Sequence, residues 1–133
     1  MEVTPAAHAA ALWAGLSLVL LLVLSVRVVR LRRKHAVALG HGDTPELERA
    51  VRAFGNATEY IPSALVALAV LALAGAPAAL AHVIGLLLLA GRVAHAWGLS
   101  RSSGASPARA LGVLATWLAY IAAAVALIFY AVP

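Results

Sequence analysis

The chain has 133 residues, of which 64% are hydrophobic and 11% are charged, and its mean hydropathy is +0.97. Because a soluble domain of this size cannot cover so much apolar surface, the composition excludes an ordinary soluble protein. The net charge is +5 at pH 7, but the basic residues flank the apolar segments, so we interpret them as topology signals and predict no nucleic-acid partner. The sequence contains no cysteine, so any thiol chemistry must come from a bound ligand.

Three charge-free segments, residues 3–26, 60–91 and 110–133, are long enough to cross a membrane. At about 1.5 Å per residue, roughly 20 apolar residues span the ~30 Å hydrocarbon core of a bilayer. The middle segment exceeds one span, and Gly75-Ala76-Pro77 within it indicates a tight turn between two helices. We therefore predict one all-α domain over residues 1–133, an integral membrane four-helix bundle with helices at about residues 6–36, 45–74, 78–99 and 107–131.

The distribution of lysine and arginine predicts how these helices are oriented. Residues 27–52 contain seven of them, and Arg101 and Arg109 lie around the loop after the third helix. Because basic loops stay in the cytoplasm, we predict that both termini lie outside. The first apolar segment is longer than the core of a signal peptide and precedes a basic cluster, so we expect it to be retained. The second helix is predicted to begin with Thr44 as its N-cap and Pro45 as its first helical residue.

Polar residues continue along the second helix after it enters the membrane. Asn56 and Glu59 follow Arg52 by four and seven residues, so the three share one helix face, which Ser63 extends. A charge at mid-membrane costs at least ~2.5 kcal/mol, so this face should meet protein or a water-filled cavity. It is either a ligand site or an ion pair of Arg52 with Glu59 between helices, with Asn56 as a hydrogen-bonding neighbour.

Two further features lie at or near the same depth. Pro62 cannot donate the helical bond to the Thr58 carbonyl, which leaves that carbonyl free for a ligand or a hydroxyl. In the third helix, Arg92 either extends to the headgroups or binds a ligand, and His95 either makes an interhelical hydrogen bond or binds a ligand. The spacing of the remaining histidines and acidic residues matches no strong metal motif, so we predict no metal site.

The second helix carries a recognisable motif: the segment from Arg52 to Pro62 reads Arg-Ala-Phe-Gly-Asn-Ala-Thr-Glu-Tyr-Ile-Pro. It resembles the second-helix signature of the MAPEG superfamily, the membrane-associated proteins in eicosanoid and glutathione metabolism. The segment from Gly91 to His95 is similar to the third helix of the prostaglandin E synthase branch. The resemblance implies a bacterial-type member in the inner membrane. It also implies a homotrimer with glutathione, a cosubstrate, bound between subunits near the cytoplasmic side.

The resemblance also implies roles for individual residues. The implied glutathione contacts come from the second helix, the third helix and the end of the first helix: Arg52, Asn56, Glu59, Tyr60, His95 and either Arg33 or Arg30. The implied catalytic residue is an arginine near the start of the fourth helix that holds the glutathione thiolate, which Arg109 matches best and Arg101 second best. The chain departs from the family at Leu99, where characterised enzymes carry a tyrosine. An arginine and a carboxylate in one pocket suit glutathione, which carries two carboxylates and one ammonium.

Three functions follow from these features. The first is a glutathione-dependent transferase or peroxidase that acts on lipophilic electrophiles arriving from the lipid bilayer. The second is a non-catalytic lipid-binding or scaffold protein of the same superfamily, which the Leu99 departure favours slightly. The third is a small proton-coupled exporter, but such four-helix chains resemble a pattern with an acidic residue in the first span, and residues 3–26 contain none.

Overall fold

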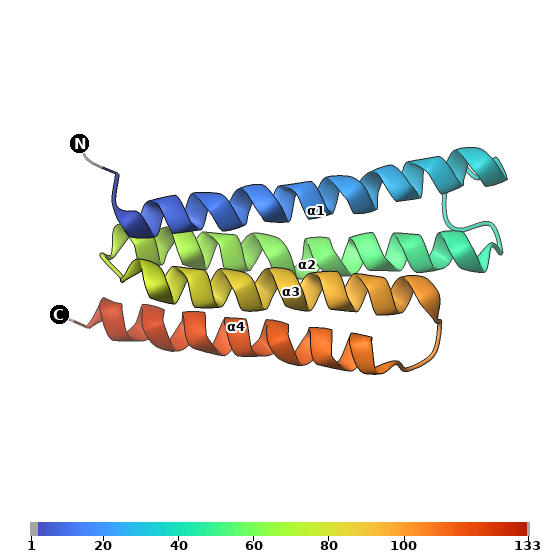
Figure 1. Cartoon of the computed structure of the whole chain (residues 1–133). Helices are drawn as coiled ribbons and strands as arrows, with labels where there is room; N and C mark the ends of the chain where they lie inside the picture. The colour runs from blue at the N-terminus through green and yellow to red at the C-terminus, as the bar shows by residue number, and fades with distance from the viewer. Residues whose placement is uncertain (1–2, 133) are drawn as a thin grey trace.

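The protein is an all-helical bundle, and the computed structural model describes its residues 3–132 (Figure 1). The helices are α1 (Pro5–His35), α2 (Pro45–Leu73), α3 (Ala78–Arg101) and α4 (Pro107–Ala131). Each is long and apolar enough to cross a membrane. The prediction of an all-α membrane chain with four spanning helices is therefore confirmed, although α3 continues two residues beyond the predicted end at residue 99.

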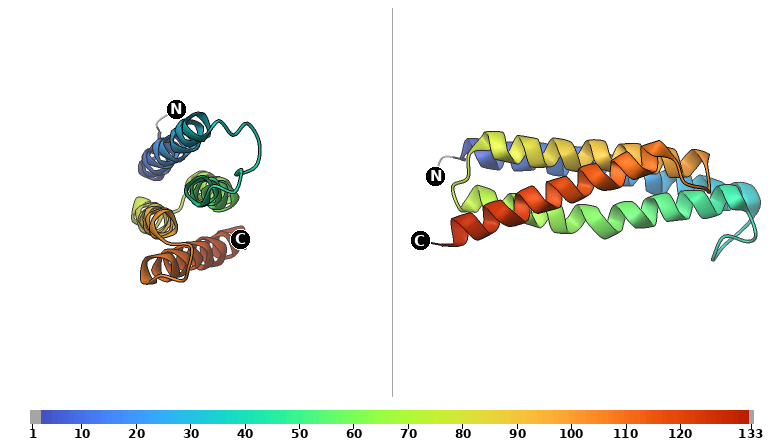
Figure 2. Two further views of the ribbon diagram at one scale, coloured as in Figure 1. Left: turned by 90° about the vertical axis from the view of Figure 1, so that its right-hand side faces the viewer. Right: turned by 90° about the horizontal axis from the view of Figure 1, so that it is seen from below.

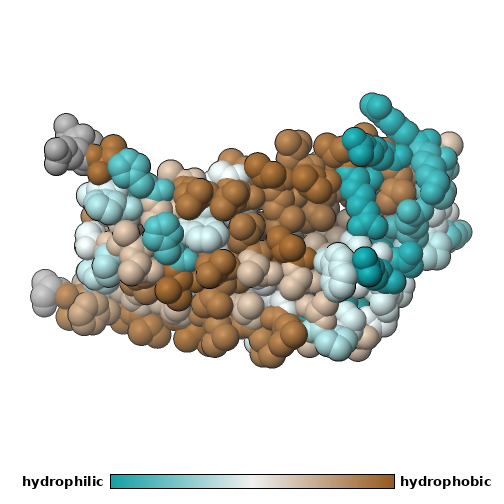
Figure 3. Space-filling model, in the orientation of Figure 1, coloured by the Kyte–Doolittle hydropathy of each residue, from teal (hydrophilic) through white to brown (hydrophobic). Residues whose placement is uncertain are grey.

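The four helices run antiparallel, with α2 and α3 between α1 and α4 (Figure 2). Within residues 3–132, α1 and α4 do not contact each other. Both termini lie at one end of the bundle (Figure 1). Hydrophilic side chains gather at the other end, over the end of α1 and the start of α2, and a broad apolar band separates the two ends (Figure 3). The arginines of the predicted site therefore lie at or near the polar end.

The helix starts are specified by local sequence signals. Proline occupies the first turn of α1, α2 and α4, where its missing N–H costs nothing. The Ser106 hydroxyl accepts a bond from the Arg109 amide at 3.3 Å and caps α4. Thr44 is the N-cap of α2 and Pro45 its first residue, as predicted, and the Thr44 hydroxyl donates to the Gly42 carbonyl at 3.2 Å without making a cap bond.

Helices α3 and α4 approach closely through a pair of glycines. A Cβ atom on Gly112 would lie 2.6 Å from the carbonyl oxygen of Gly91 and 2.6 Å from the amide nitrogen of His95. Both contacts are with backbone, which cannot move aside without shifting a helix. The absence of side chains here therefore sets the distance between the two helices, and with it the place of Arg92 and His95 beside α4.

Replacing Gly112 with alanine is expected to lower the free energy of unfolding by about 1–3 kcal/mol, because the added methyl group overpacks the contact between α3 and α4. The matched control is Gly15→Ala in α1, where a Cβ would meet nothing within 4 Å. There the higher helix propensity of alanine should leave stability unchanged or raise it by up to about 1 kcal/mol. Unfolding of both variants in mixed micelles, followed by helical circular dichroism, tests the prediction. Equal stability of the two variants would contradict it.

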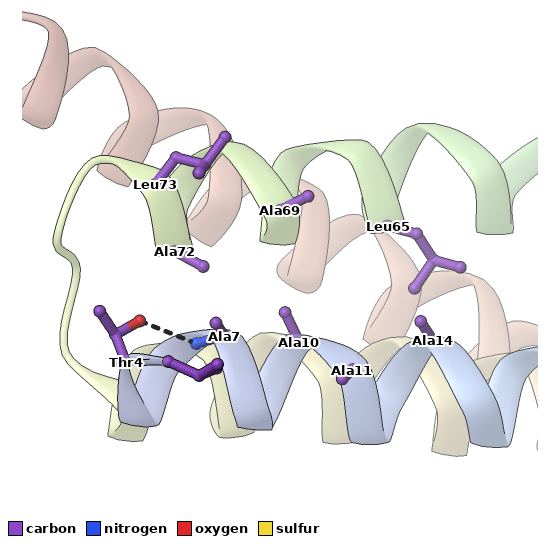
Figure 4. A pocket seen from close by; sticks show the side chains of 10 residues that line it. Thr4, Ala7, Ala10, Ala11, Ala14, Leu65, Ala69, Ala72 and Leu73 are labelled. Carbon is purple, nitrogen blue, oxygen red and sulfur yellow. Dashed lines mark hydrogen bonds between the residues drawn. The ribbon is translucent and has the colours of Figure 1, made fainter. Parts of the chain in front are cut away.

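The end of the bundle that carries the termini contains an apolar space of about 610 Å³ between α1 and α2 (Figure 4). Small side chains line it, among them Ala7, Ala10 and Ala72. Its one polar side chain, Thr4, already accepts a cap bond from the Ala7 amide at 3.2 Å. This space offers no group for acid–base or ionic chemistry, in contrast to the polar end of the bundle.

Candidate functional site

A polar pocket of about 260 Å³ lies toward the polar end of the bundle, between α2, α3, the loop of residues 102–106 and the start of α4. Four charged side chains and a histidine contribute to its wall. The lining residues are Glu48, Arg49, Arg52, Asn56, His95, Leu99, Ser103 and Arg109. The structure thus brings together four of the predicted site residues from three helices: Arg52, Asn56, His95 and Arg109.

The three arginines of this pocket have no carboxylate partner within residues 3–132, where the salt bridges are those of Glu46 with Lys34 and His35. Arg109 donates from Nη1 to the carbonyls of Ser103 at 3.3 Å and Gly104 at 2.5 Å. Within residues 3–132, the Nε and Nη2 atoms of Arg109 make no hydrogen bond. Because a guanidinium has five N–H donors, each of these arginines retains donors for an anion.

Gly98 of α3 allows Arg109 to reach this position. A Cβ atom on Gly98 would lie 2.9 Å from Ser106 Oγ and 3.0 Å from both the Cγ and the amide nitrogen of Arg109. The first turn of α4 therefore packs directly on the backbone of α3. Together with the Ser106 cap, this contact fixes the base of the Arg109 side chain at the edge of the pocket.

Arg92 lies outside the polar pocket, and its guanidinium is bonded within the protein, unlike those of the pocket arginines. It is 2% exposed, and its three guanidinium nitrogens donate to Thr116 Oγ1 at 2.8 Å, Asn56 Oδ1 at 2.6 Å and the Gly112 carbonyl at 3.0 Å. The guanidinium also lies 4.8 Å from the centroid of the Tyr60 ring. The proposal that Arg92 extends to the headgroups is therefore wrong, because α2 and α4 supply all its partners.

The Arg92 contact also determines how Asn56 faces the pocket. Since arginine can only donate, the amide oxygen of Asn56 must face Arg92, and its NH₂ group points away from it. Asn56 lines the pocket, so it offers the pocket hydrogen-bond donors. These donors add to those of the arginines and favour an anionic ligand.

The hydroxyl groups near Pro62 form a second, part-buried contact between α2 and α4. The Tyr120 hydroxyl donates to the Tyr60 carbonyl at 2.6 Å and lies 2.5 Å from Ser63 Oγ. The two tyrosine rings meet edge to face with centroids 5.8 Å apart. A hydroxyl does bind the backbone beside Pro62, but it binds the carbonyl of Tyr60 and not that of Thr58 as the sequence suggested.

Other predicted site residues lie outside the pocket. Tyr60 packs under Arg92, and Glu59 is exposed on α2. Within the described chain, Glu59 makes no ion pair with Arg52, so the intramolecular form of that alternative is wrong. Arg33 and Arg30 are both exposed on α1, and neither lines the pocket of its own subunit.

Arg101, the second candidate for the thiolate-binding arginine, is held elsewhere. Its guanidinium lies 4.3 Å from the centroid of the Trp97 ring, one turn earlier on α3. It does not line the polar pocket. Arg109 is therefore the better placed of the two arginines.

A second, apolar space of about 460 Å³ lies along the loop before α4 and the first turns of α4, with His95 of α3 in its wall. Its wall includes Ala110, Val113 and Leu114. His95 and Arg109 line both this space and the polar pocket. Arg109 therefore borders both a polar space that suits an anion and an apolar space that suits an apolar molecule.

Comparison with known proteins identifies the family. The MAPEG family model matches residues 10–129. The chain belongs to the MAPEG family. It is 41% identical over 120 residues to the inner membrane protein YecN of Escherichia coli strain K12, and the alignment covers 90% of each chain. YecN of Escherichia coli O6:H1 matches equally well. The relatives' name and the four apolar helices agree with an integral inner membrane protein.

Three polar lining residues of this MAPEG pocket were not predicted from the sequence: Glu48, Arg49 and Ser103. A signal for the first two was present, because Glu48 and Arg49 precede Arg52 by four and three residues and so lie on the same side of the helix. The polar stripe therefore extends toward the start of α2, away from Glu59. Ser103 lies in a loop, where periodicity makes no prediction.

Proposed function

We propose that this MAPEG protein is a glutathione-dependent transferase or peroxidase that acts on lipophilic electrophiles in the inner membrane, with its basic loops in the cytoplasm. The observation that carries this proposal is the polar pocket, where Arg49, Arg52 and Arg109 have free donors beside the carboxylate of Glu48. Glutathione has two carboxylates, a thiol and one ammonium, so its charges complement this set once the thiol is ionised.

Arg109 is proposed to stabilise the thiolate of bound glutathione. A thiol with a pKa near 8.5 is only about 3% ionised at pH 7, and lowering the pKa to about 7 makes half of it thiolate. To lower the pKa by this amount, the protein must stabilise the thiolate relative to the thiol by about 2 kcal/mol, which one well-placed guanidinium can supply. Arg109 suits the role because Nη1 is anchored to two loop carbonyls while other donors remain free.

The apolar space beside His95 and Arg109 is proposed to bind the acceptor. In conjugation, the thiolate sulfur forms a bond to an electrophilic carbon, and the leaving group departs with the electron pair of the broken bond. In peroxide reduction, the thiolate sulfur bonds to one peroxide oxygen as the O–O bond breaks, which gives a glutathione sulfenic acid and an alkoxide that is protonated to the alcohol. A second glutathione then attacks the sulfenic sulfur, which forms the disulfide and releases water. Both reactions need the sulfur between a polar pocket and an apolar one, as the shared lining of His95 and Arg109 allows.

Association of subunits is part of the proposal. Glu59 is exposed on α2 although it lies in a membrane-spanning segment. Leaving such a charge against lipid costs at least ~2.5 kcal/mol, so a second copy of the chain is the natural partner for this face. A homotrimer, as the family resemblance implies, would also allow Glu59, Tyr60 and Arg33 or Arg30 to complete glutathione sites between subunits.

One observation favours a non-catalytic lipid-binding protein instead. Leu99 lines the polar pocket, so an apolar side chain stands where related enzymes are expected to place a tyrosine hydroxyl. Under this alternative, lipid would purify with the protein and glutathione would produce no turnover.

The function is tested with purified protein in proteoliposomes, by conjugation of glutathione to chlorodinitrobenzene and by reduction of cumene hydroperoxide. Replacing Arg52 with alanine is expected to raise the KM for glutathione about 10- to 100-fold, because a charge-assisted bond to a carboxylate is lost. Arg32→Ala is the matched control, since Arg32 donates to the Ala38 carbonyl and does not line the pocket. Absence of turnover in folded wild-type protein with bound lipid would favour the alternative.

A further inference from the structure

Two arginines outside the polar pocket lie where the charged end of the bundle meets the membrane-spanning segments. Arg27 of α1 is the first charged residue after the charge-free residues 3–26, and Arg101 is the last residue of α3. Arg27 donates from Nη1 to the hydroxyl of Ser100, the residue before Arg101. This bond brings Arg27 to the turn of α3 that carries Arg101.

Both arginines are oriented by the protein but keep donors free. The Nε and Nη2 atoms of Arg27 make no hydrogen bond within the described chain. The Arg101 guanidinium lies over the Trp97 ring and makes no hydrogen bond there either. Neither arginine has a carboxylate partner in the described chain, where Glu46 forms the salt bridges. Because a guanidinium has five N–H donors in a planar fork, the two arginines can bind one phosphate group together.

The side of α1 that carries Arg27 faces α3 along most of the bundle. Trp13 precedes Arg27 by fourteen residues, about four helical turns, and so shares its side of α1. Trp13 Nε1 donates to His82 of α3 at 3.2 Å, as Arg27 donates to Ser100 farther along α3. These two bonds mark a line of contact between the helices, which we call the α1–α3 seam.

Exposed apolar side chains border the α1–α3 seam between these two bonds. The residues four and eleven positions before Arg27 share its side of α1, and those four and eleven positions before Trp97 share its side of α3. These four exposed side chains are Leu16, Val23, Leu86 and Val93. The seam thus joins two arginines with free donors to an apolar surface that faces the membrane interior.

We propose that the α1–α3 seam binds an anionic phospholipid, with its phosphate between Arg27 and Arg101 and its acyl chains on the apolar side chains of the seam. Trp97 is 54% exposed beside Arg101, and an indole ring at this level suits the headgroup region. Basic sites between transmembrane helices on the cytoplasmic side bind acidic headgroups. A soluble anion would leave the apolar surface without a partner. This lipid is distinct from the acceptor of the proposed function, which lies beside His95 and Arg109, and its binding does not depend on glutathione.

The fluorescence of Trp97 tests the proposal, because bromine atoms on lipid chains quench a tryptophan that they contact. Full-length protein is placed in phosphatidylcholine vesicles with a small, increasing fraction of brominated phosphatidylglycerol or brominated phosphatidylcholine. The signal of Trp97 is the difference between wild type and Trp97→Phe. Each arginine should favour the anionic lipid about fivefold, so phosphatidylglycerol should quench Trp97 at an about 10- to 25-fold lower fraction than phosphatidylcholine.

The variants assign this preference to the two arginines. Arg27→Gln and Arg101→Gln should each reduce it to about fivefold, and the double variant should abolish it. Arg101 contacts only its own helix through Trp97, so Arg101→Gln keeps the test valid even if loss of the Arg27 bond disturbs the fold. The matched control is Arg33→Gln, because Arg33 follows Arg27 by six residues, lies on another side of α1 and should leave the preference unchanged.

Three results would overturn the proposal. The first is equal quenching of Trp97 by the two lipids in wild-type protein. The second is a preference that survives in the double variant or falls equally in Arg33→Gln, since it would then come from the general positive charge of this end. The third is displacement of the brominated phosphatidylglycerol by an equal concentration of glycerol 3-phosphate, which would indicate a site for a soluble anion.

Discussion

Replacing Arg109 with alanine is expected to lower kcat/KM for glutathione conjugation about 100- to 1,000-fold, the usual effect of removing one preorganised donor from a developing or stabilised anion. Arg109 lines both the polar pocket and the apolar space, so the sulfur atom would lie beside it in the reacting complex. The loss should fall mainly on kcat, because Arg49 and Arg52 remain to bind the carboxylates. Steady-state kinetics in proteoliposomes measure both constants.

Arg101→Ala is the control for this prediction, because Arg101 lies on the Trp97 ring and outside the pocket. It should retain activity within about twofold of wild type, as expected for a surface substitution worth up to ~0.5 kcal/mol. Full activity of Arg109→Ala together with loss in Arg101→Ala would reverse the assignment of the thiolate-binding arginine.

Replacing Arg92 with methionine is expected to destabilise the fold by about 2–4 kcal/mol, although it removes a charge from the interior. Arg92 binds Asn56, Thr116 and Gly112, which belong to α2 and α4. Thr116 and Gly112 can still pair with each other, since Thr116 Oγ1 donates to the Gly112 carbonyl at 2.9 Å. The Asn56 oxygen loses its bond to a charged group, which is worth about 1.5–3 kcal/mol, and the contact of Arg92 with the Tyr60 ring, worth about 0.5–2 kcal/mol, is lost as well.

The same substitution at an exposed arginine, Arg30→Met on α1, is the control and should leave the stability within about 0.5 kcal/mol of wild type. Unfolding by sodium dodecyl sulfate in mixed micelles, followed by helical circular dichroism, measures both variants. Arg92→Met should also weaken glutathione binding, because Asn56 loses the contact that orients its amide toward the pocket. Wild-type stability of Arg92→Met would show that the buried network does not hold α2 and α4 together.

Much of the fold was predictable because membrane insertion imposes simple rules. Lengths of apolar segments gave the four spans, and Gly75-Ala76-Pro77 located the turn between α2 and α3. The start of α4 at Pro107 was also predicted. Thr44 is the N-cap of α2 as predicted, but the sequence could not show that its hydroxyl donates to the Gly42 carbonyl and makes no cap bond, because a threonine at this position has both options.

The site was predictable only in part. The helical repeat placed Arg52 and Asn56 together, but it could not show how α3 is rotated against α2 and α4. That rotation depends on the close contact of Gly91 with Gly112, which buries Arg92 and leaves His95 at the pocket. The repeat also could not show that the polar face of α2 lines the pocket only as far as Asn56. Glu59 was therefore grouped with Arg52 and Asn56, although the structure leaves it exposed outside the pocket.

The central claim is that the polar pocket binds glutathione as an activated thiolate, and a pH titration of the thiolate ultraviolet absorbance tests it most directly. The measurement is the difference spectrum of glutathione added to purified, folded protein, with free glutathione as reference. The account predicts a saturable signal whose midpoint falls from about 8.5 for the free thiol to about 7. A midpoint that stays at the free value despite saturable binding, or no saturable signal at all, would contradict it.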